Sequence, residues 1–431
     1  MGSGRGWPTT RSTRSIWCRG HPGRTCGSRA NKPWTSRVGN VLPFARSSSV
    51  LTPTLLACYA MSGVIHLASI SLNTLLPFHV VALGGSRTQV GLLFSATTVV
   101  SMALRPAVGG WIDRFGARWV ILPGIAVLAV ASLALHVPVT PEAVIAVMVG
   151  TGIGNGLVSM TASVLTVRAT GVAHRGEALS LYYLASSLAI AVAPPMAFGL
   201  RGLGGMPLAF AAVTVFAVVL FALALSIPVS VTAPAPGAQS GFRPISRHAV
   251  SVSFALALTT IGHSSIYAFL PLYAVSRGHG AAVVWFFTVY SIWLIVWRAL
   301  LGGLSDRIGR ARVALPAMAL TGLAYFTLAL PPTPASLMIA ALLLGAGSAV
   351  LYPTLAALVV DRAPEGERGL ALGTLSGAWD LGVVVGSALI GFVADRVSFG
   401  SGFAIAGVTT MLGALAFFVT ERHPTRRASV V

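Results

Sequence analysis

The stretch RALLGGLSDRIGR, residues 298–310, places charged residues and glycines between two long apolar runs. Residues 105–117, RPAVGGWIDRFGA, have nearly the same spelling. Only 9% of the chain is charged, so a charged cluster that occurs twice marks a particular position in the fold. Charged side chains are tolerated at the ends of membrane spans, where they reach water. Both stretches therefore predict short turns between spans.

The composition places the chain among membrane proteins. Hydrophobic residues make up 55% of its 431 residues, and the mean hydropathy is +0.82. A soluble domain cannot bury that much apolar surface. Most of the ten acidic residues lie near the ends of apolar runs, as expected for segments that cross a lipid bilayer.

The net charge of +19 does not indicate nucleic-acid binding. Residues 1–50 hold nine basic residues and no acid, and the other charges are scattered in short connections. Three cysteines, Cys18, Cys26 and Cys58, form neither a metal-binding spacing nor a disulfide framework. We therefore expect no metal, no cofactor and no nucleic-acid partner.

Residues 1–48 are rich in Arg, Ser, Gly and Trp and have no periodicity, which predicts a disordered basic tail. One hypothesis is that the start is mis-assigned and that translation begins near Val41, Val50 or Met61. The alternative is a cytoplasmic tail that contacts anionic lipid.

The rest of the chain contains twelve apolar runs long enough to span a bilayer, which needs roughly 20 residues each. They cover residues 53–80, 88–111, 119–138, 142–167, 177–200, 205–229, 249–274, 281–301, 312–331, 335–360, 369–393 and 401–420. The predicted fold class is an all-α membrane protein of twelve transmembrane helices.

The basic residues are biased toward alternate connections, such as those with Arg114 and Arg118 or with Arg307 and Arg310. By the positive-inside rule this bias predicts that both termini are cytoplasmic. The longest connection, 230–248, lies on the same side and serves as a linker between residues 49–229 and 249–431.

The two halves repeat at a fixed offset. Arg298 follows Arg105 by 193 positions, and Asp306 follows Asp113 by the same number. The pairs Gly152 and Gly345, Gly154 and Gly347, and Arg175 and Arg368 share this offset. The repeat predicts two six-helix bundles that face each other, which is a transporter architecture.

On these motifs, the chain resembles the major facilitator superfamily, and its bacterial efflux-type members in particular. The resemblance covers residues 50–420. It is carried by a gating motif after the second span and by its copy after the eighth, which comprise Gly109, Asp113, Arg114, Gly116, Arg118, Gly302, Asp306, Arg307, Gly309 and Arg310.

The gating motif also has a direct physical interpretation. Gly109 and Gly302 allow two helices to approach closely, and Gly116 and Gly309 allow a tight reversal. An aspartate in this motif can cap a helix amino terminus or pair with an arginine across the interface between the bundles. Such contacts can latch one conformation. The alternative is a turn with solvated charges that only set topology.

Asp380 is the acid that lies near the middle of an apolar run, and an ionisable residue at that depth predicts a functional role. It can bind a proton for coupling or pair with a cationic substrate; the alternative is a structural carboxyl. Arg105 and Arg298, near the membrane ends of their spans, are candidates for the same coupling role, as partners of the latch or as side chains that snorkel to lipid phosphates.

Other polar and aromatic residues at mid-span depth are candidates to line a cavity. They are His66, Asn73, Asn155, His263, Tyr267, Tyr290, Trp293, Tyr352 and Trp379. Such a lining suits an amphipathic or cationic organic molecule. Packing or interhelical hydrogen bonding is the alternative for each.

Two departures from the efflux-type pattern matter. Met148 stands where these proteins usually carry an arginine, and APPMAF replaces a glycine-rich element in the fifth span. Pro194 and Pro195 still predict a helix bend there.

The resemblance implies a monomeric secondary transporter in the bacterial inner membrane, which exports a small organic molecule by alternating access with proton antiport. The alternatives are a proton-coupled uptake symporter for a metabolite and, more remotely, a membrane sensor. The sequence has no nucleotide-binding loop and no hydrolase motif, so we expect no enzyme activity.

Overall fold

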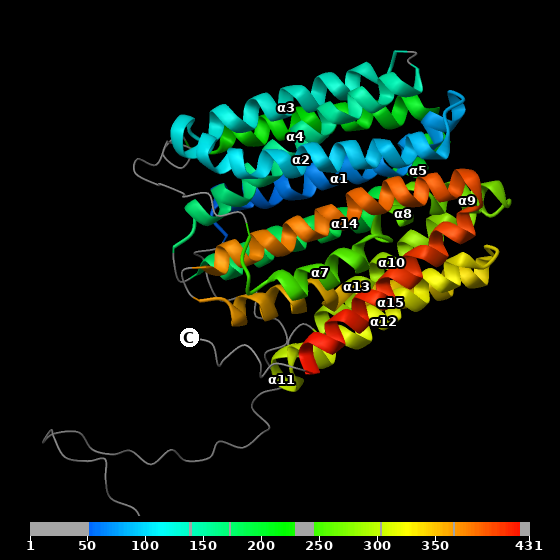
Figure 1. Cartoon of the computed structure of the whole chain (residues 1–431). Helices are drawn as coiled ribbons and strands as arrows, with labels where there is room; N and C mark the ends of the chain where they lie inside the picture. Colours follow the sequence, from blue (N-terminus) through cyan, green and yellow to red (C-terminus); the bar gives the residue numbers. More distant parts are fainter. Residues whose placement is uncertain are drawn as a thin grey trace, which may run out of the picture. The chain divides into compact units, whose positions relative to one another are not determined.

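Every regular element that the structure assigns to the described residues is a helix (Figure 1). The computed structural model describes residues 51–137, 140–171, 174–228, 245–301, 304–364 and 367–422. The predicted tail at 1–48 and residues 230–244 of the predicted linker lie outside this part of the chain, as does Gly302.

The helices, in chain order, are α1 Pro53–Ala82, α2 Arg87–Phe115, α3 Ala117–Ala134, α4 Pro141–Arg168, α5 Arg175–Ser226, α7 Val250–Thr260, α8 His263–Ala268, α9 Leu270–Ser276, α10 Gly280–Leu301, α11 Leu304–Ile308, α12 Arg310–Ala329, α13 Pro334–Arg362, α14 Arg368–Arg396 and α15 Phe399–Arg422. Ten helices in the described part are long and apolar enough to cross a membrane. α2 is an eleventh if its two segments, Arg87–Arg105 and Ala107–Phe115, which are bent by 50°, count as one span.

Several helices begin at a Thr-Pro pair. The hydroxyls of Thr52, Thr140 and Thr333 accept hydrogen bonds from backbone N–H groups of α1, α4 and α13. The proline that follows each threonine occupies the first helical turn, where a backbone N–H is not needed. Thr140 and Thr333 are 193 positions apart, so the repeat includes these helix starts.

Glycines of the repeat make equivalent close contacts in the two halves. A methyl group at Gly152 of α4 would lie 2.6 Å from the Thr97 carbonyl oxygen of α2, and one at Gly345 of α13 would lie 2.9 Å from the Tyr290 carbonyl oxygen of α10. Thr97 and Tyr290 are themselves 193 positions apart. These positions need glycine because a Cβ would collide with the neighbouring backbone. The sequence repeat is therefore also a repeat of packing.

The expected seventh span, 249–274, is divided into α7, α8 and α9. Gly262 lies at the first division, and a methyl group there would lie 2.5 Å from the Tyr325 ring. The expected fifth and sixth spans fall within α5, whose backbone leaves the helical region at Gly204 and Gly205. This break lies at the expected boundary between the fifth and sixth spans, at 200–205. Pro194 and Pro195 lie inside the helical part, and the bend expected there stays a prediction.

The gating motif is more helical than the sequence predicted. Gly109, Asp113 and Arg114 belong to α2, and the reversal into α3 needs only Gly116, whose φ is 86°. In the second copy, Gly309 has a φ of 100° between α11 and α12. Positive φ favours glycine because it has no Cβ.

The buried core is shared at one end of the helices and divided at the other. One apolar cluster joins residues from both halves, among them Leu72, Val90 and Ile390. A second cluster contains only residues of α1–α5 and the residue after α5, and a third contains only residues between Ala249 and Phe417. The halves therefore pack together at the end where α2 begins and α14 finishes.

Helices α2 and α14 follow this pattern along their length, and Figure 1 shows α14 beside the helices of the first half. A methyl group at Gly391 would lie 2.9 Å from the Arg87 carbonyl oxygen and 3.1 Å from the Gly91 Cα atom. At the other ends of these helices, a methyl group at Gly109 or Gly373 would meet no atom within 4 Å. We call the first end the closed end and the second the open end.

Candidate functional site

An ion pair joins α2 to α14 between these two ends. Nη1 of Arg105 lies 2.5 Å from Oδ2 of Asp380, and Nη2 of Arg105 donates to Oδ1 at 3.3 Å. The Asp380 side chain is 9% exposed, whereas the Arg105 side chain is 42% exposed. Water therefore reaches the arginine side of a carboxylate that is otherwise buried. This contact shows that Arg105 pairs with an acid of the opposite half in this structure.

The second candidate arginine makes the equivalent contact at the opposite interface. Nη1 of Arg298 in α10 donates to Oγ of Ser187 in α5 at 2.6 Å, and its Nε donates to the Ala349 carbonyl oxygen at 3.2 Å. Asp380 follows Ser187 by 193 positions, the same offset that relates the two arginines. The repeat therefore places an arginine at each interface, with an acid as its partner on one side and a serine on the other.

Five of the candidate cavity residues form one cluster in the second half. The His263 ring lies 5.8 Å from the Tyr267 ring and 4.8 Å from the Trp379 ring, and the Trp379 ring lies 5.5 Å from the Tyr352 ring. Tyr290 lies within electrostatic reach of Tyr267. Because Trp379 precedes Asp380 in α14, this aromatic cluster lies beside the ion pair.

The remaining cavity candidates lie elsewhere. Asn155 of α4 accepts a hydrogen bond from the Ser69 hydroxyl of α1 at 3.1 Å. Nδ1 of His66 hydrogen-bonds to the Ser62 carbonyl oxygen of its own helix at 2.8 Å, and Asn73 is half-buried on α1. Trp293 packs edge-on against Trp297 at 5.9 Å. His66 and Asn155 thus make the interhelical or local bonds that were the alternative to ligand binding.

The site includes one residue that was not among the predicted candidates. Ser187 is unremarkable in the sequence, but the offset of 193 from Asp380 could have identified it. Tyr183 of α5 is 58% exposed and lies within electrostatic reach of Tyr352 and Arg105. An exposed tyrosine among these groups indicates that the space between the halves is open to solvent here.

The gating motif forms ion pairs within each half. Nη2 of Arg168 in α4 lies 2.6 Å from Oδ1 of Asp113 in α2. In the second half, Nε of Arg310 in α12 lies 3.2 Å from Oδ2 of Asp361 in α13. Asp361 is the repeat equivalent of Arg168, but Arg310 is the equivalent of Ala117, so the second half forms its ion pair from a different position of the motif.

The other motif residues make local contacts. Arg118 donates to the carbonyl oxygens of Leu225 and Ile227 at 3.3 and 2.9 Å, which ties α3 to the end of α5. Arg114 lies over the Phe115 ring at 5.2 Å, and Arg307 is exposed. The side chain of Asp306 lies outside the part that the structure describes.

The closed end has a reciprocal contact between α2 and α14. Oδ2 of Asp395 accepts hydrogen bonds from Oγ1 and N of Thr88 at 2.7 and 3.4 Å, and its Oδ1 accepts from the Arg87 backbone N–H at 3.2 Å. In return, Nη1 of Arg87 donates to the Ala394 carbonyl oxygen at 2.6 Å. Each helix end therefore supplies hydrogen-bond partners that the other end lacks.

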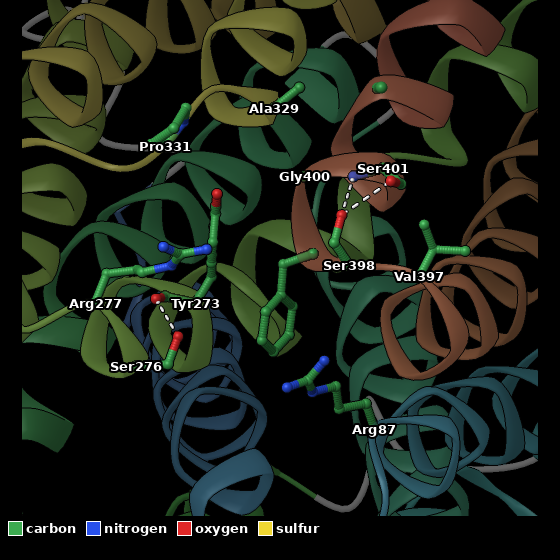
Figure 2. Close-up of a pocket in the computed structure, with 12 residues that line it drawn as sticks. Arg87, Tyr273, Ser276, Arg277, Ala329, Pro331, Val397, Ser398, Gly400 and Ser401 are labelled. Atoms are coloured by element: carbon green, nitrogen blue, oxygen red, sulfur yellow. Dashed lines mark hydrogen bonds between the residues drawn. The ribbon is translucent and has the colours of Figure 1, made fainter.

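A pocket of about 560 Å³ lies beside this contact. Figure 2 shows Arg87, Arg277 and Ser398 on its walls. Arg87 comes from the first half, and the other lining residues come from the second half. Within the described residues, no group of three or more His, Cys, Asp or Glu side chains is placed to hold a metal ion.

Comparisons with known proteins match this chain along most of its length. The family model described as Major Facilitator Superfamily matches residues 58–304 and again residues 252–430. The "Staphylopine export protein" of Staphylococcus aureus is 25% identical over 392 residues, which covers 87% of this chain and 98% of that protein. An "Uncharacterized MFS-type transporter" of Pseudomonas aeruginosa is 28% identical over 356 residues, covering 80% of this chain and 87% of that one.

Solved structures show the same fold at low identity. The nucleoside transporter NupG superposes with a TM-score of 0.69 at 15% identity and covers 86% of this chain and 100% of that chain. The peptide transporter POT in complex with sulfate has a TM-score of 0.70 at 14% identity and covers 86% of this chain and 94% of that chain.

Proposed function

Because the chain belongs to the Major Facilitator Superfamily, we propose that it exports a small organic molecule across the bacterial plasma membrane in exchange for protons. The observation that carries this proposal is the Arg105–Asp380 ion pair, which links the two halves between the closed end and the open end. A proton-coupled transporter needs a titratable group whose protonation can differ between its two conformations, and this carboxylate can serve as that group.

We propose that the transporting unit is one chain with twelve spans in two six-helix halves, residues 49–229 and 249–431. The support is the ten helices of spanning length, the bent helix α2 and the glycine break that divides α5. The repeat and its equivalent packing contacts at Gly152 and Gly345 support the division into halves. The basic connections support a cytoplasmic location for both termini and for the linker at 230–248.

With this topology the open end faces the cytoplasm. The charged connections with Arg114 and Arg307 lie at the open end, whereas the Arg87–Asp395 contact lies at the closed end. The conformation is therefore inward-facing. Export begins from this state, because a cytoplasmic molecule can enter between the halves.

Asp380 supplies the coupling in this proposal. As a carboxylate it forms charge-assisted hydrogen bonds with Arg105, and these hold α2 to α14. When Asp380 binds a proton, it loses its charge, and the attraction to Arg105 weakens. In export by antiport, Asp380 therefore binds a proton from outside in the outward-facing state, in which the two helices have separated at the closed end. It releases this proton to the cytoplasm in the inward-facing state, where the carboxylate pairs with Arg105 again. Protons thus enter as the exported molecule leaves.

In this proposal the gating motif latches the outward-facing state. In the inward-facing state the pairs Asp113–Arg168 and Arg310–Asp361 each stay within one half. Gly109 and Gly373 meet open space, which leaves room for α2 and α14 to approach each other at this end. We propose that this approach completes the outward-facing state.

Export rather than uptake is supported by the similarity to a staphylopine exporter, which matches most of this chain. The test uses inside-out vesicles with an imposed pH gradient, in which pairs of organic acids and amines are screened for uptake with a fluorescent pH indicator. Export by antiport predicts that an acidic vesicle interior drives accumulation of a substrate. Accumulation only when the gradient is reversed would indicate the uptake symporter instead.

A further inference from the structure

The two interfaces between the halves differ by one charge. Arg105 and Arg298 occupy equivalent positions, and both reach across to the opposite half. Arg105 meets the carboxylate of Asp380, whereas Arg298 meets the neutral hydroxyl of Ser187. The Arg105–Asp380 pair is neutral as a unit, so the charge of Arg298 remains.

No carboxylate of a described residue balances Arg298. Its hydrogen-bond acceptors are the Ser187 hydroxyl and the Ala349 carbonyl oxygen, and Tyr290 is the group within electrostatic reach. A cation within a membrane span is costly unless it is paired or lies in a water-filled cavity. Among the described residues this charge is thus left unbalanced, and a molecule from outside the chain can balance it.

Arg298 also lines a cavity that can admit such a molecule. The cavity has a volume of about 300 Å³ and lies among α10, α11, α12 and α13. Ser305, Arg310 and Thr354 contribute its other polar side chains, and none of its lining residues is acidic. Arg310 is already paired with Asp361, which leaves Arg298 as the wall residue with neutral partners.

We propose that Arg298 binds a carboxylate group of the transported molecule, so that the substrate is an organic anion or a zwitterion. The guanidinium group presents donors that match the two oxygens of a carboxylate. This inference rests on the proposed transport function and names its substrate class. It replaces the cationic substrate expected from the sequence, because the acid that would bind a cation, Asp380, is already held by Arg105.

The test exploits the repeat by giving Arg298 the partner that Arg105 already has. Ser187→Asp places a carboxylate beside Arg298, and Ser187→Asn adds a side chain of nearly the same size without charge. Arg298→Gln removes the cation. Arg422→Gln is the matched control, since Arg422 lies at the far end of α15 over the Phe418 ring.

Each full-length variant is purified into lipid nanodiscs, and ligand affinity is measured from the shift of its thermal unfolding. The probes are two pairs of matched skeleton, 3-phenylpropionate with 3-phenylpropylamine and glutarate with 1,5-diaminopentane. We expect wild type and Arg422→Gln to bind a carboxylate more tightly than its paired amine. Ser187→Asp should bind that carboxylate at least about tenfold more weakly than Ser187→Asn, and Arg298→Gln should lose the preference.

The inference is overturned if no carboxylate binds, if the amines bind better, or if the preference survives in both Ser187→Asp and Arg298→Gln. Transport of the same probes into proteoliposomes separates this outcome from failure of the proposed function. If amines are carried equally well by wild type and Arg298→Gln, the protein is a transporter but the substrate class is wrong. If wild type carries no member of either pair, both proposals fail.

Discussion

Gly91→Ala is expected to open the closed end. A methyl group at Gly91 of α2 would lie 3.1 Å from the Ser387 carbonyl carbon and 3.2 Å from the Gly391 Cα atom of α14. Backbone atoms cannot rotate out of the way, so the two helices must move apart. Overpacking of this kind costs about 1–3 kcal/mol. The gain in helix propensity from Gly to Ala is the same in both conformations and cancels.

That cost applies only to the conformation in which α2 and α14 touch at this end. The ratio of outward-facing to inward-facing molecules should therefore rise by roughly 5-fold to 150-fold. Gly109→Ala is the matched control on the same helix, because its methyl group would meet no atom within 4 Å in this structure. It should not raise that ratio.

The assay is electron–electron distance measurement between spin labels in a cysteine-free background. One label pair, at Val137 and Val397, reports the closed end, and a second pair, at Trp119 and Ile308, reports the open end; all four side chains are exposed. In Gly91→Ala the first distance should lengthen and the second should shorten in the same fraction of molecules. If the first lengthens while the second stays unchanged, the halves do not move as rigid units, and our reasoning is refuted.

Two further predictions concern other contacts of the fold. Asp395→Ala removes the acceptor for Thr88 and for the Arg87 backbone N–H. We expect the ratio of outward-facing to inward-facing molecules to rise, as in Gly91→Ala, but by only about 0.5–1 kcal/mol because the carboxylate is exposed; the same spin labels measure it. Gly347→Ala should lower the thermal unfolding temperature, because its methyl group would lie 2.7 Å from the Ala317 carbonyl oxygen, at a cost of about 1–3 kcal/mol. Gly373→Ala is the control and should not lower it, because a methyl group there would meet no atom within 4 Å. Equal unfolding temperatures for these two glycine variants would contradict the packing described.

The sequence predicted the family and the helical class because these depend on hydropathy and on a repeat that can be counted. The offset of 193 between Arg105 and Arg298 also predicted two equivalent arginines. Their different partners could not be predicted from hydropathy, since Ser187 is a common residue in an apolar run. The offset of 193 from Asp380 points to Ser187, but only the interface between α5 and α10 shows that its hydroxyl accepts a hydrogen bond from Arg298.

Helix boundaries were predicted less well, for a reason tied to glycine and proline. In a membrane helix both residues are tolerated because neighbouring helices satisfy the backbone, so neither marks a break reliably. Pro194 and Pro195 lie within α5, whereas the expected span 249–274, which was predicted as one helix, is divided near Gly262. The contacts of Asp113 were also open from the sequence, because acids at span ends can pair within a half or across halves.

The most direct test of the account is proton coupling in Asp380→Asn. Wild type and Asp380→Asn are reconstituted in proteoliposomes with a probe that wild type carries, and both accumulation driven by a pH gradient and exchange without a gradient are measured. Glu421→Gln, at the end of α15 where Glu421 pairs with Arg362, is the control. We predict that Asp380→Asn loses gradient-driven accumulation but retains exchange, while Glu421→Gln keeps both. Full proton-driven accumulation in Asp380→Asn would contradict the central claim that this carboxylate carries the coupling.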